Sequence, residues 1–317
     1  MNEKAMKGCE VLLYTCAGAQ PGEKVLVITD DKMLEIGMTM YQRASQDFDA
    51  TLVLTRPRET HGSAPTKIVA AAMKEADIIF SATTFSLYNT PARIGACKAG
   101  ARFVNMADYS MKMLEEGCLF VDFAEVRALV DATAAKITGS NCRLTTPAGT
   151  DLRASIEGRK AVSGYGMANK PGMASSPPDI ETAVGPVTAE GKLAIDGSIP
   201  LPGLGALKET VYLDVEGGYI KKIYGGEEAK ILEETLASFN DPRVYLVGEI
   251  GFGMNTGASI SGRMLEDEGV FGTMHIGIGN NLSYGGENAT PIHIDLIMKK
   301  PSYEVDGRFV LKDAEIV

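Results

Sequence analysis

Four side chains in the last quarter of the chain have the types and spacing of a metal site. They are Glu249, His275, His293 and Asp295. Carboxylate and imidazole groups are the natural ligands of Zn, Mn, Fe and Co in proteins. The chain has only three histidines, and two of them lie in this segment. The segment therefore predicts a metal-binding site.

The four side chains fall on three short strand-like runs: residues 244–253, 272–279 and 292–298. Successive side chains of a strand point to opposite faces. His293 and Asp295 therefore share one face, and the apolar residues between them form the other. Glu249 and His275 each share a face with glycines, which would leave room for an ion and a substrate. A buried His-x-Asp pair that only forms a structural hydrogen bond is the alternative.

Length and composition are those of a globular protein with one large or two smaller domains. The 317 residues carry 41 acidic and 31 basic side chains, a net charge of −10, and no basic run stands out. We therefore expect no nucleic-acid partner. No stretch approaches about 18 uninterrupted apolar residues, and the first residues lack the apolar core of a signal peptide. We expect no membrane partner.

The cysteines predict a reducing compartment. Their number is odd, no C-x-x-C pair occurs, and all precede residue 143, away from the predicted metal site. This usage is typical of reduced structural thiols in a cytoplasmic protein. The five are Cys9, Cys16, Cys97, Cys118 and Cys142.

Residues 1–140 predict an N-terminal, open, doubly wound α/β domain. Continuous apolar strands separated by helices indicate a parallel sheet that is covered on both faces. No G-x-G-x-x-G follows the first strand and no Walker A sequence occurs, so we expect no nucleotide cofactor. The predicted strands are 24–29, 50–55, 76–81 and 101–106, and the predicted helices are 33–45, 64–75, 91–99 and 122–137.

Residues 141–317 predict a β-rich α+β domain that carries the metal site. The pattern changes near residue 140, after which short strands and glycines dominate and one clear helix, 227–239, interrupts them. Turn signals at 216–218 and 306–307 predict hairpins. We place the domain boundary near 139–141.

Ordered motifs in this second half resemble the aminopeptidase T/aminopeptidase S family of metallopeptidases. The resemblance covers roughly residues 140–317, and only the α/β pattern is shared before that. The motifs are 145–159 (TTPAGTDLRASIEGR), 178–181 (PDIE), 190–191 (EG), 195–199 (IDGSI), 248–249 (GE), 265–268 (LEDE), 272–279 (GTMHIGIG), 285–288 (GGEN) and 292–296 (IHIDL).

The resemblance implies a two-metal hydrolase that acts as a homodimer on an amide bond of a small molecule or short peptide. Two ions of Zn, Co or Mn would activate a water molecule for attack on the carbonyl group. Glu181 would act as general base and Tyr284 would stabilise the oxyanion, while Glu266 is the alternative to Glu268 as a ligand. The implied metal ligands are Glu181, Glu249, Glu268, His275, His293 and Asp295.

The same fold family contains 2,5-dihydroxypyridine 5,6-dioxygenase, a ring-cleaving Fe(II) enzyme, which this chain also resembles at 239–245 (FNDPRVY) and 285–295. In that enzyme a histidine stands at the position of Glu249, a serine stands at that of Gly277, and the position of His275 is not histidine. Iron oxygenases favour two histidines and one carboxylate. Up to four carboxylates suit two ions, so the ligand chemistry favours the hydrolase. The dioxygenase with Fe(II) is the alternative, and a non-catalytic metal- or ligand-binding protein is a third.

Overall fold

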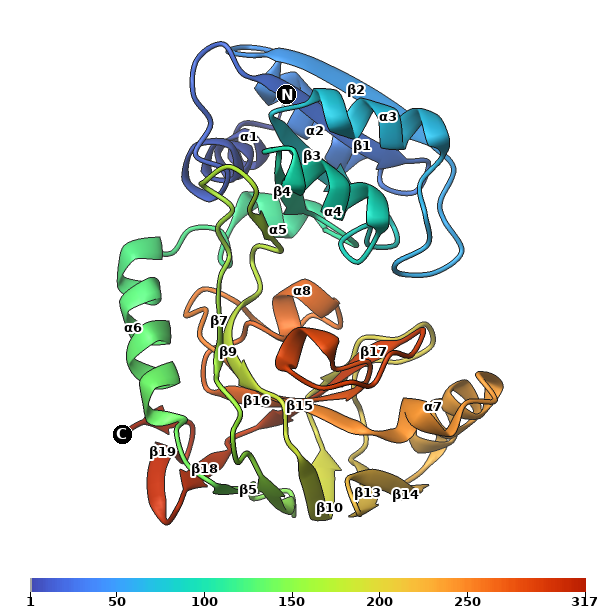
Figure 1. The fold of residues 1–317 in the computed structure, drawn as a ribbon, viewed down its shortest axis with the longest axis vertical. Coiled ribbons are helices and arrows are strands. Elements are labelled where there is room, and N and C mark those ends of the chain that lie inside the picture. The colour runs from blue at the N-terminus through green and yellow to red at the C-terminus, as the bar shows by residue number, and fades with distance from the viewer. Residues whose placement is uncertain (1) are drawn as a thin grey trace. The chain divides into compact units, whose positions relative to one another are not determined.

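The computed structural model describes residues 2–317 and forms two compact units (Figure 1). The first unit comprises the chain up to Phe123 together with Tyr165–Pro178, and the second comprises Ala124–Gly164 and Asp179–Val317. The chain thus enters the second unit, returns to the first for a short segment, and leaves it again. The predicted domains, 1–140 and 141–317, stay a prediction, because the compact units do not show which parts of the chain fold independently.

The first unit is built on a five-stranded parallel sheet with the order β2-β1-β3-β4-β8. Its four longer strands lie close to the four predicted apolar runs. Backbone pairing between β4 and β8 explains why a segment after residue 164 belongs to this unit. The strands are β1 (Lys24–Asp30), β2 (Asp49–Thr55), β3 (Ile78–Ala82), β4 (Arg102–Asn105) and β8 (Ala174–Ser175).

Helices cover both faces of this sheet because its strands are apolar on both sides. Leu26 of β1 lies in one core cluster with Val69 and Met73 of α3. On the opposite face, Gly37 of α2 lies directly against Thr29 of β1. The predicted doubly wound α/β arrangement is confirmed. The helical elements are α1 (Glu3–Glu10), the π-helical η1 (Val11–Cys16), α2 (Leu34–Ala44), α3 (Lys67–Glu75), α4 (Pro91–Lys98) and α5 (Met111–Glu115).

Helix α3 begins at Lys67, later than the predicted start at Ala64. Ala64 precedes Pro65, and a residue before proline is disfavoured in the helical region. Thr66 then serves as the N-cap, because its hydroxyl accepts a hydrogen bond from the Val69 N–H.

The second unit contains two layers of antiparallel strand pairs, so the predicted β-rich fold class is confirmed. The first layer is an eight-stranded sheet with the order β14-β13-β10-β6-β5-β18-β19-β20. Its hairpins turn at the predicted Gly-containing sites, 216–218 and 306–307. The strands are β5 (Asn141–Thr145), β6 (Asp151–Ser155), β10 (Thr188–Ile195), β13 (Val211–Glu216), β14 (Tyr219–Tyr224), β18 (Ser302–Val305), β19 (Arg308–Lys312) and β20 (Glu315–Ile316).

The second layer is a seven-stranded sheet with the order β12-β11-β17-β16-β15-β9-β7. The two sheets contact each other through aromatic side chains, since Phe252 of this sheet meets Tyr303 of the other edge-to-face at 4.8 Å between ring centroids. The strands are β7 (Val162–Tyr165), β9 (Ile180–Val184), β11 (Ser198–Ile199), β12 (Gly205–Ala206), β15 (Val247–Gly253), β16 (Thr273–Gly279) and β17 (His293–Lys299).

Helical segments flank these sheets. Strand β15 begins at Val247 rather than at Val244, because Asp241 caps a 3-10 turn over the preceding residues by accepting from the Arg243 N–H. The segments are α6 (Phe123–Lys136), α7 (Glu227–Ser238), α8 (Met264–Asp267), η2 (Pro242–Tyr245) and η3 (Leu282–Tyr284).

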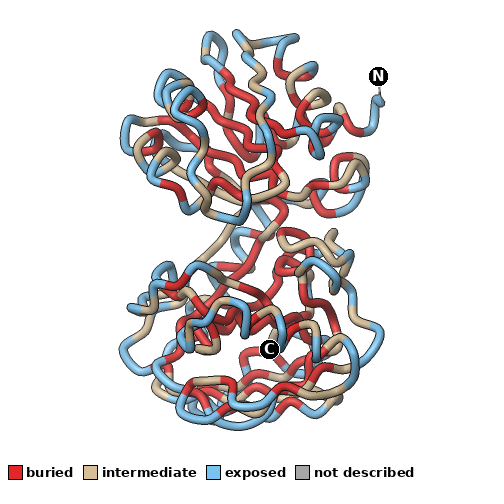
Figure 2. The backbone as a smooth tube through the Cα atoms, turned by 90° about the vertical axis from the view of Figure 1, so that its right-hand side faces the viewer, coloured by how far each residue is buried: buried red, intermediate tan, exposed pale blue. Residues whose placement is uncertain are grey.

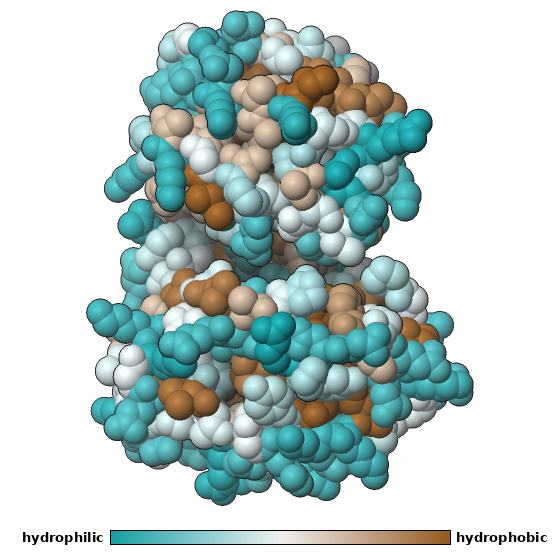
Figure 3. All heavy atoms as spheres, turned by 45° about the vertical axis from the view of Figure 1, so that its right-hand side comes forward, coloured by the Kyte–Doolittle hydropathy of each residue, from teal (hydrophilic) through white to brown (hydrophobic). Residues whose placement is uncertain are grey.

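Burial follows the strands within each unit, and polar side chains dominate the face that Figure 3 shows. The buried trace in Figure 2 runs along the parallel sheet of the first unit and through both layers of the second. Apolar side chains on the visible face lie in separate spots among hydrophilic ones (Figure 3). Among residues 2–317, no helix combines the length and apolar character needed to cross a membrane.

The close approach of α1 and α5 gives a test of the packing in the first unit. A Cβ added at Gly8 of α1 would overlap the Leu114 carbonyl of α5. Helix propensity alone would make Gly8→Ala stabilising by about 1 kcal/mol, but we expect overpacking to dominate and to lower the free energy of unfolding by about 1–3 kcal/mol. Urea denaturation measures the change.

The matched control is Gly95→Ala in α4, where an added Cβ meets nothing within 4 Å. This variant should be stabilised by up to about 1 kcal/mol. A gain of stability in both variants would contradict the packing of α1 on α5.

Candidate metal centre

Four adjacent strands of the seven-stranded sheet bring five ionisable side chains together. Their order is β17-β16-β15-β9, so β9 (Ile180–Val184) and β15 (Val247–Gly253), which are far apart along the chain, become neighbours. Each of the five is at least three-quarters buried, and four are 8% exposed or less. The five are Glu181 on β9, Glu249 on β15, His275 on β16, and His293 and Asp295 on β17.

Every one of these side chains stands opposite a glycine of the neighbouring strand. Residues directly opposite each other in an antiparallel pair have Cβ atoms only about 4.5–5.5 Å apart, so a second side chain there would compete for the same space. The cross-strand pairs are Glu181 with Gly253, Glu249 with Gly277, His275 with Gly251, Asp295 with Gly277, and His293 with Gly279.

The glycines leave room, as predicted, but the ionisable side chains themselves fill it. A Cβ at Gly277 would lie 2.6 Å from both Glu249 Oε2 and His293 Cε1. A Cβ at Gly251 would overlap the His275 ring. The sheet therefore accepts these groups only because the opposing positions lack side chains.

Glu249 is the centre of the group. Its Oε1 lies 3.4 Å from His275 Nε2, and its Oε2 lies 2.8 Å from His293 Nε2. His275 Nε2 also lies 3.0 Å from Glu181 Oε2, and His293 Nε2 lies 3.3 Å from Asp295 Oδ1. Two sets of potential ligand atoms, each within 4.8 Å of one another, share Glu249: Glu181, Glu249 and His275 form one, and Glu249, His293 and Asp295 form the other.

Several buried polar atoms in this group have no hydrogen-bond partner among residues 2–317. Buried polar groups in native proteins are nearly always satisfied, and each exception needs an explanation. A cation coordinated by these atoms would satisfy them. Among the described residues, Glu268 Oε1 and His275 Nδ1 have no partner, whereas Glu181 Oε2, Glu249 Oε2 and Asp295 Oδ1 lie 3.0, 2.8 and 3.3 Å from an imidazole Nε2 but without hydrogen-bond geometry.

The protonation behaviour of the group indicates an excess of negative charge. Burial raises the pKa of Glu181, and the neighbouring Glu249 carboxylate raises it further. Burial lowers the pKa of His275, but its close contacts with the Glu181 and Glu249 carboxylates outweigh this, so the pKa stands well above its usual range. The pKa of His293 is likewise raised by Asp295 and Glu249 against the effect of burial. Such a potential attracts a cation.

The orientation of His293 suits coordination through Nε2. Its Nδ1 donates a hydrogen bond to the Asn280 carbonyl oxygen over 2.6 Å, which leaves Nε2 as the nitrogen that faces the carboxylates. Ligating histidines commonly have their other ring nitrogen held in this way, which sets both tautomer and ring orientation. His275 Nδ1 has no such partner among the described residues.

The remaining predicted site residues lie at the edge of this group. Burial raises the pKa of Glu268, and the charge of the adjacent Asp295 raises it further. Glu266, the alternative ligand, instead accepts hydrogen bonds from the Ser259 N–H and hydroxyl. Glu266 therefore holds a loop, whereas Glu268 lies next to the cluster. Tyr284 is half-buried and stacks on the His293 ring at 5.6 Å and 24°.

A further acid, Asp179, belongs to the group and was not predicted. Burial raises its pKa well above the usual range, and Glu181 is the next largest cause. Its Oδ1 is buried without a hydrogen-bond partner among the described residues. The signal in the sequence was Asp179-x-Glu181, since residues two apart on an extended segment share a face.

Comparison with known proteins links the whole chain to one enzyme family. The sequence model of the family described as 2,5-dihydroxypyridine 5,6-dioxygenase (NicX) matches residues 6–317. A curated protein of Pseudomonas putida KT2440 named 2,5-dihydroxypyridine 5,6-dioxygenase is 28% identical over 261 residues, which are 78% of this chain and 72% of that protein.

Two solved structures share the fold. The 2,5-dihydroxypyridine dioxygenase from Pseudomonas putida KT2440 has a TM-score of 0.78 at 22% identity, with 99% of this chain and 96% of that chain covered. Wild-type AmpT from Thermus thermophilus has a TM-score of 0.70 at 14% identity, with 99% of both chains covered. The predicted resemblance to aminopeptidase T is therefore a resemblance of fold.

The predicted activity needs correction. The prediction of a hydrolase, an aminopeptidase-like metalloprotease, is wrong, because the family match over residues 6–317 and the curated relative favour the alternative dioxygenase. The error came from counting carboxylates as free ligands. The same oxygen and nitrogen ligands accept several metals and support several reactions.

The glycine opposite Glu249 and Asp295 allows a direct test of the centre. We expect Gly277→Ala to reduce metal affinity at least about tenfold, because the new Cβ displaces Glu249 and His293 while both neighbouring strands hold the backbone in place. Elemental analysis after equilibrium dialysis measures metal per chain. Gly95→Ala, which adds the same methyl group in open space, should bind as the unmodified protein does. Equal metal content in both variants would contradict a metal centre here.

Proposed function

Because the chain belongs to the 2,5-dihydroxypyridine 5,6-dioxygenase family, we propose that it is a non-haem Fe(II) dioxygenase that opens a hydroxylated pyridine-type ring. The observation that carries the proposal is the position of Glu249 between His275 and His293, with one carboxylate oxygen toward each imidazole. Two histidines and one carboxylate are the ligand composition typical of non-haem Fe(II) oxygenases.

The residues present fit such an ion. The orphaned buried atoms, the excess negative charge and the Nε2 of His293 directed at the carboxylates all support cation binding. We propose that Glu249, His275 and His293 hold the iron together with Asp295. We propose one Fe(II) per chain. The second ion stays a prediction, which elemental analysis of metal per chain tests.

When bound, Fe(II) supplies the redox chemistry by which both atoms of O2 enter the ring-cleaved product. The protein's own groups bind, orient and exchange protons with the ring. Tyr284 stacks on His293, so its face and hydroxyl form one wall beside the ligands. Burial raises the pKa of Tyr284 well above 10, and the nearby carboxylates add to this. Its phenol therefore remains a proton donor at neutral pH.

The surplus carboxylates are proposed to take up protons and not to hold a second catalytic ion. Hydroxyl groups on a pyridine-type ring must lose protons for the ring to become electron-rich enough to react with oxygen. Glu181 is not among the proposed iron ligands, its Oε2 lies 3.0 Å from His275 Nε2, and Asp179 lies beside it. We assign Glu181 the role of base, with Asp179 behind it. We also propose that the substrate is a small molecule and that the protein acts as a homodimer.

The proposal predicts paired losses of metal and of activity in a histidine variant. Protein loaded anaerobically with Fe(II) should consume about one O2 per 2,5-dihydroxypyridine in an oxygen-electrode assay. His293→Ala should lose both the iron and the oxygen uptake, because one ligand and the contact to Glu249 disappear.

The matched control is His61→Ala, at the third histidine, which lies in the first unit. It should retain the iron and the fold. Iron-loaded protein that consumes no oxygen with any mono- or dihydroxypyridine would contradict the proposed reaction. Retained iron in His293→Ala would contradict the ligand assignment.

The role of Tyr284 can be separated from metal binding. Tyr284→Phe keeps the stacked ring and removes the hydroxyl, so we expect unchanged iron content and a turnover number lower by roughly 10²-fold. Steady-state oxygen uptake measures kcat and KM. Tyr224→Phe, on edge strand β14 of the other sheet, serves as the control and should retain full turnover. An unchanged kcat in Tyr284→Phe would rule out the proton-donor role.

A further inference from the structure

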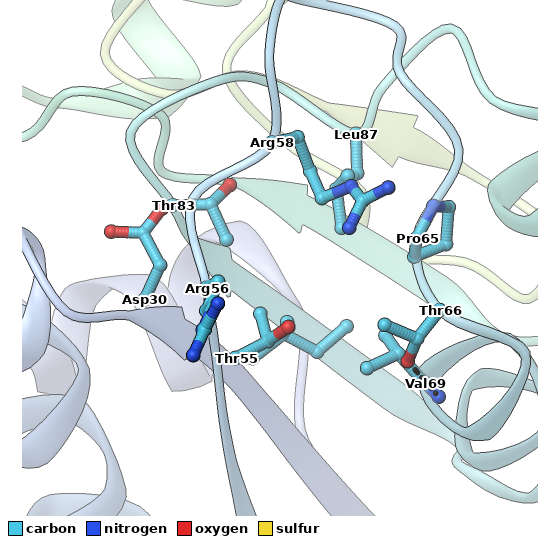
Figure 4. A pocket seen from close by; sticks show the side chains of 10 residues that line it. Asp30, Thr55, Arg56, Arg58, Pro65, Thr66, Val69, Thr83 and Leu87 are labelled. Atoms are coloured by element: carbon cyan, nitrogen blue, oxygen red, sulfur yellow. Dashed lines mark hydrogen bonds between the residues drawn. The ribbon is translucent and has the colours of Figure 1, made fainter.

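The carboxyl ends of β1 and β3 in the first unit, where open α/β sheets usually bind ligands, are closed in this protein. The hollow that Figure 4 shows there has a cavity volume of about 10 Å³, which is room for one water molecule. Asp30, at the end of β1, accepts from the N–H and the hydroxyl of Thr84, which follows β3, at 2.6 and 2.9 Å. This hollow therefore has no room for a small-molecule ligand.

In the second unit, the loop that joins β16 to β17, residues 280–292, contacts the metal centre in two ways. The Asn280 carbonyl oxygen accepts the hydrogen bond from His293 Nδ1. The Tyr284 ring stacks on the His293 imidazole. Because one contact meets the edge of the imidazole and the other its face, the orientation of His293 depends on the conformation of this loop.

Asn281 lies at the centre of the loop and is 5% exposed. Its backbone carbonyl accepts from the Tyr284 N–H and the Gly286 N–H, each at 3.1 Å. Its side-chain Oδ1 accepts from the Asn288 N–H at 2.8 Å, and its own N–H donates to the Asn288 carbonyl at 3.2 Å. Asn281 therefore ties the turn that carries Tyr284 to the returning half of the loop.

Asn288 anchors this arrangement to the rest of the unit. Its Nδ2 donates to the Gly279 carbonyl of β16 at 2.7 Å and to the Arg243 carbonyl at 2.9 Å. Gly279 is the residue directly opposite His293 in the strand pair. The loop is thus fixed to the sheet beside the histidine that it contacts.

Glycines leave the space that Asn281 and Tyr284 occupy. A Cβ at Gly286 would overlap the Asn281 side-chain amide, and a Cβ at Gly248 of β15 would lie 2.9 Å from the Asn281 Cβ. A Cβ at Gly185 would overlap the Tyr284 carbonyl oxygen. Because the surrounding backbone fits so closely, the Asn281 side chain has one position in the loop.

We propose that Asn281 is a positioning residue of the metal centre. Through the loop it holds the Asn280 carbonyl oxygen on His293 Nδ1 and the Tyr284 ring on the His293 imidazole. The inference rests on the proposed function and adds to it a residue outside the ligand set. Groups that orient a ligating histidine contribute about 10- to 100-fold to metal affinity.

Metal affinity gives the first test. Fe(II) is titrated anaerobically into the full-length protein in competition with a chelator of known affinity. Asn281→Ala removes the acceptor for the Asn288 N–H, so the loop loosens, and we expect the Kd for Fe(II) to rise at least about tenfold. A Kd equal to that of the unmodified protein overturns the proposal.

The matched control is Thr150→Val. The Thr150 hydroxyl, also buried, accepts from the Ala194 N–H of β10 at 2.8 Å, in the other sheet of the same unit. This variant loses a hydrogen bond of the same kind, so its free energy of unfolding should fall by a similar amount while its Kd for Fe(II) stays unchanged. An equal rise of the Kd in both variants shows a general effect of destabilisation and overturns the proposal.

Turnover tests the link to Tyr284. With iron-saturated protein and 2,5-dihydroxypyridine, Asn281→Ala should lower kcat at least about tenfold and leave KM nearly unchanged. The double variant Asn281→Ala/Tyr284→Phe should have about the kcat of Tyr284→Phe alone, because both changes remove the same positioned hydroxyl. Losses of kcat that multiply overturn the action through Tyr284.

Gly286→Ala provides the test if Asn281→Ala does not fold. It keeps Asn281 but displaces its side chain, because the added Cβ overlaps the amide, and it should raise the Kd for Fe(II) in the same way. Gly95→Ala, in open space, should not.

Failure of this inference differs from failure of the proposed function. Unmodified protein that binds Fe(II) without consuming oxygen contradicts the proposed reaction, and the Kd values of the variants still decide the role of Asn281. Unmodified protein that binds no Fe(II) contradicts both.

Discussion

The structure of the second unit depends on one constraint, the placement of five buried ionisable side chains in the middle of a sheet. Strand pairs normally bury apolar side chains opposite each other. Here each ionisable group faces a glycine on the next strand, and the space of the missing side chain is taken by the carboxylate or imidazole itself. The glycines are therefore required at these positions, because this sheet can contain such a cluster only where the opposing residue has no side chain.

The cluster is electrostatically incomplete as a set of protein groups alone. Two imidazoles face more carboxylates than they can neutralise. Burial and the neighbouring Glu249 carboxylate raise the pKa of Glu181, and the carboxylates raise the pKa of both histidines against the effect of burial. Several buried oxygens also lack a hydrogen bond of good geometry among the described residues. A divalent cation would compensate for both features. The His293–Asn280 hydrogen bond orients one imidazole for coordination.

The ligand set by itself does not determine the reaction. The same carboxylates and imidazoles suit a pair of hydrolytic ions or one iron, and proteins with the fold include both an AmpT and a 2,5-dihydroxypyridine dioxygenase. Counting acids favoured hydrolysis, whereas the match over residues 6–317 favours the dioxygenase. The structure explains part of the excess, since Glu266 accepts hydrogen bonds from the Ser259 N–H and hydroxyl instead of facing the cluster.

Much of the architecture followed from local pattern. The apolar runs of the first half specified a parallel sheet, because strands buried on both faces leave no other arrangement, and His293-x-Asp295 showed one polar strand face. The predicted starts of helix α3 and strand β15 were each three residues too early. A cap after Pro65 sets the start of α3, and a capped 3-10 turn that begins at Pro242 delays β15.

The sequence by itself determined the ligand types and their strands, because side-chain alternation along a strand is a local property. Only the tertiary structure decided that Asp179 joins the cluster, that Glu268 lies beside Asp295, and that residues 165–178 return to the first unit through β8. Each of these depends on pairing between distant segments. Pairing of that kind is set by the packing of the whole sheet, which leaves no period or spacing in the sequence.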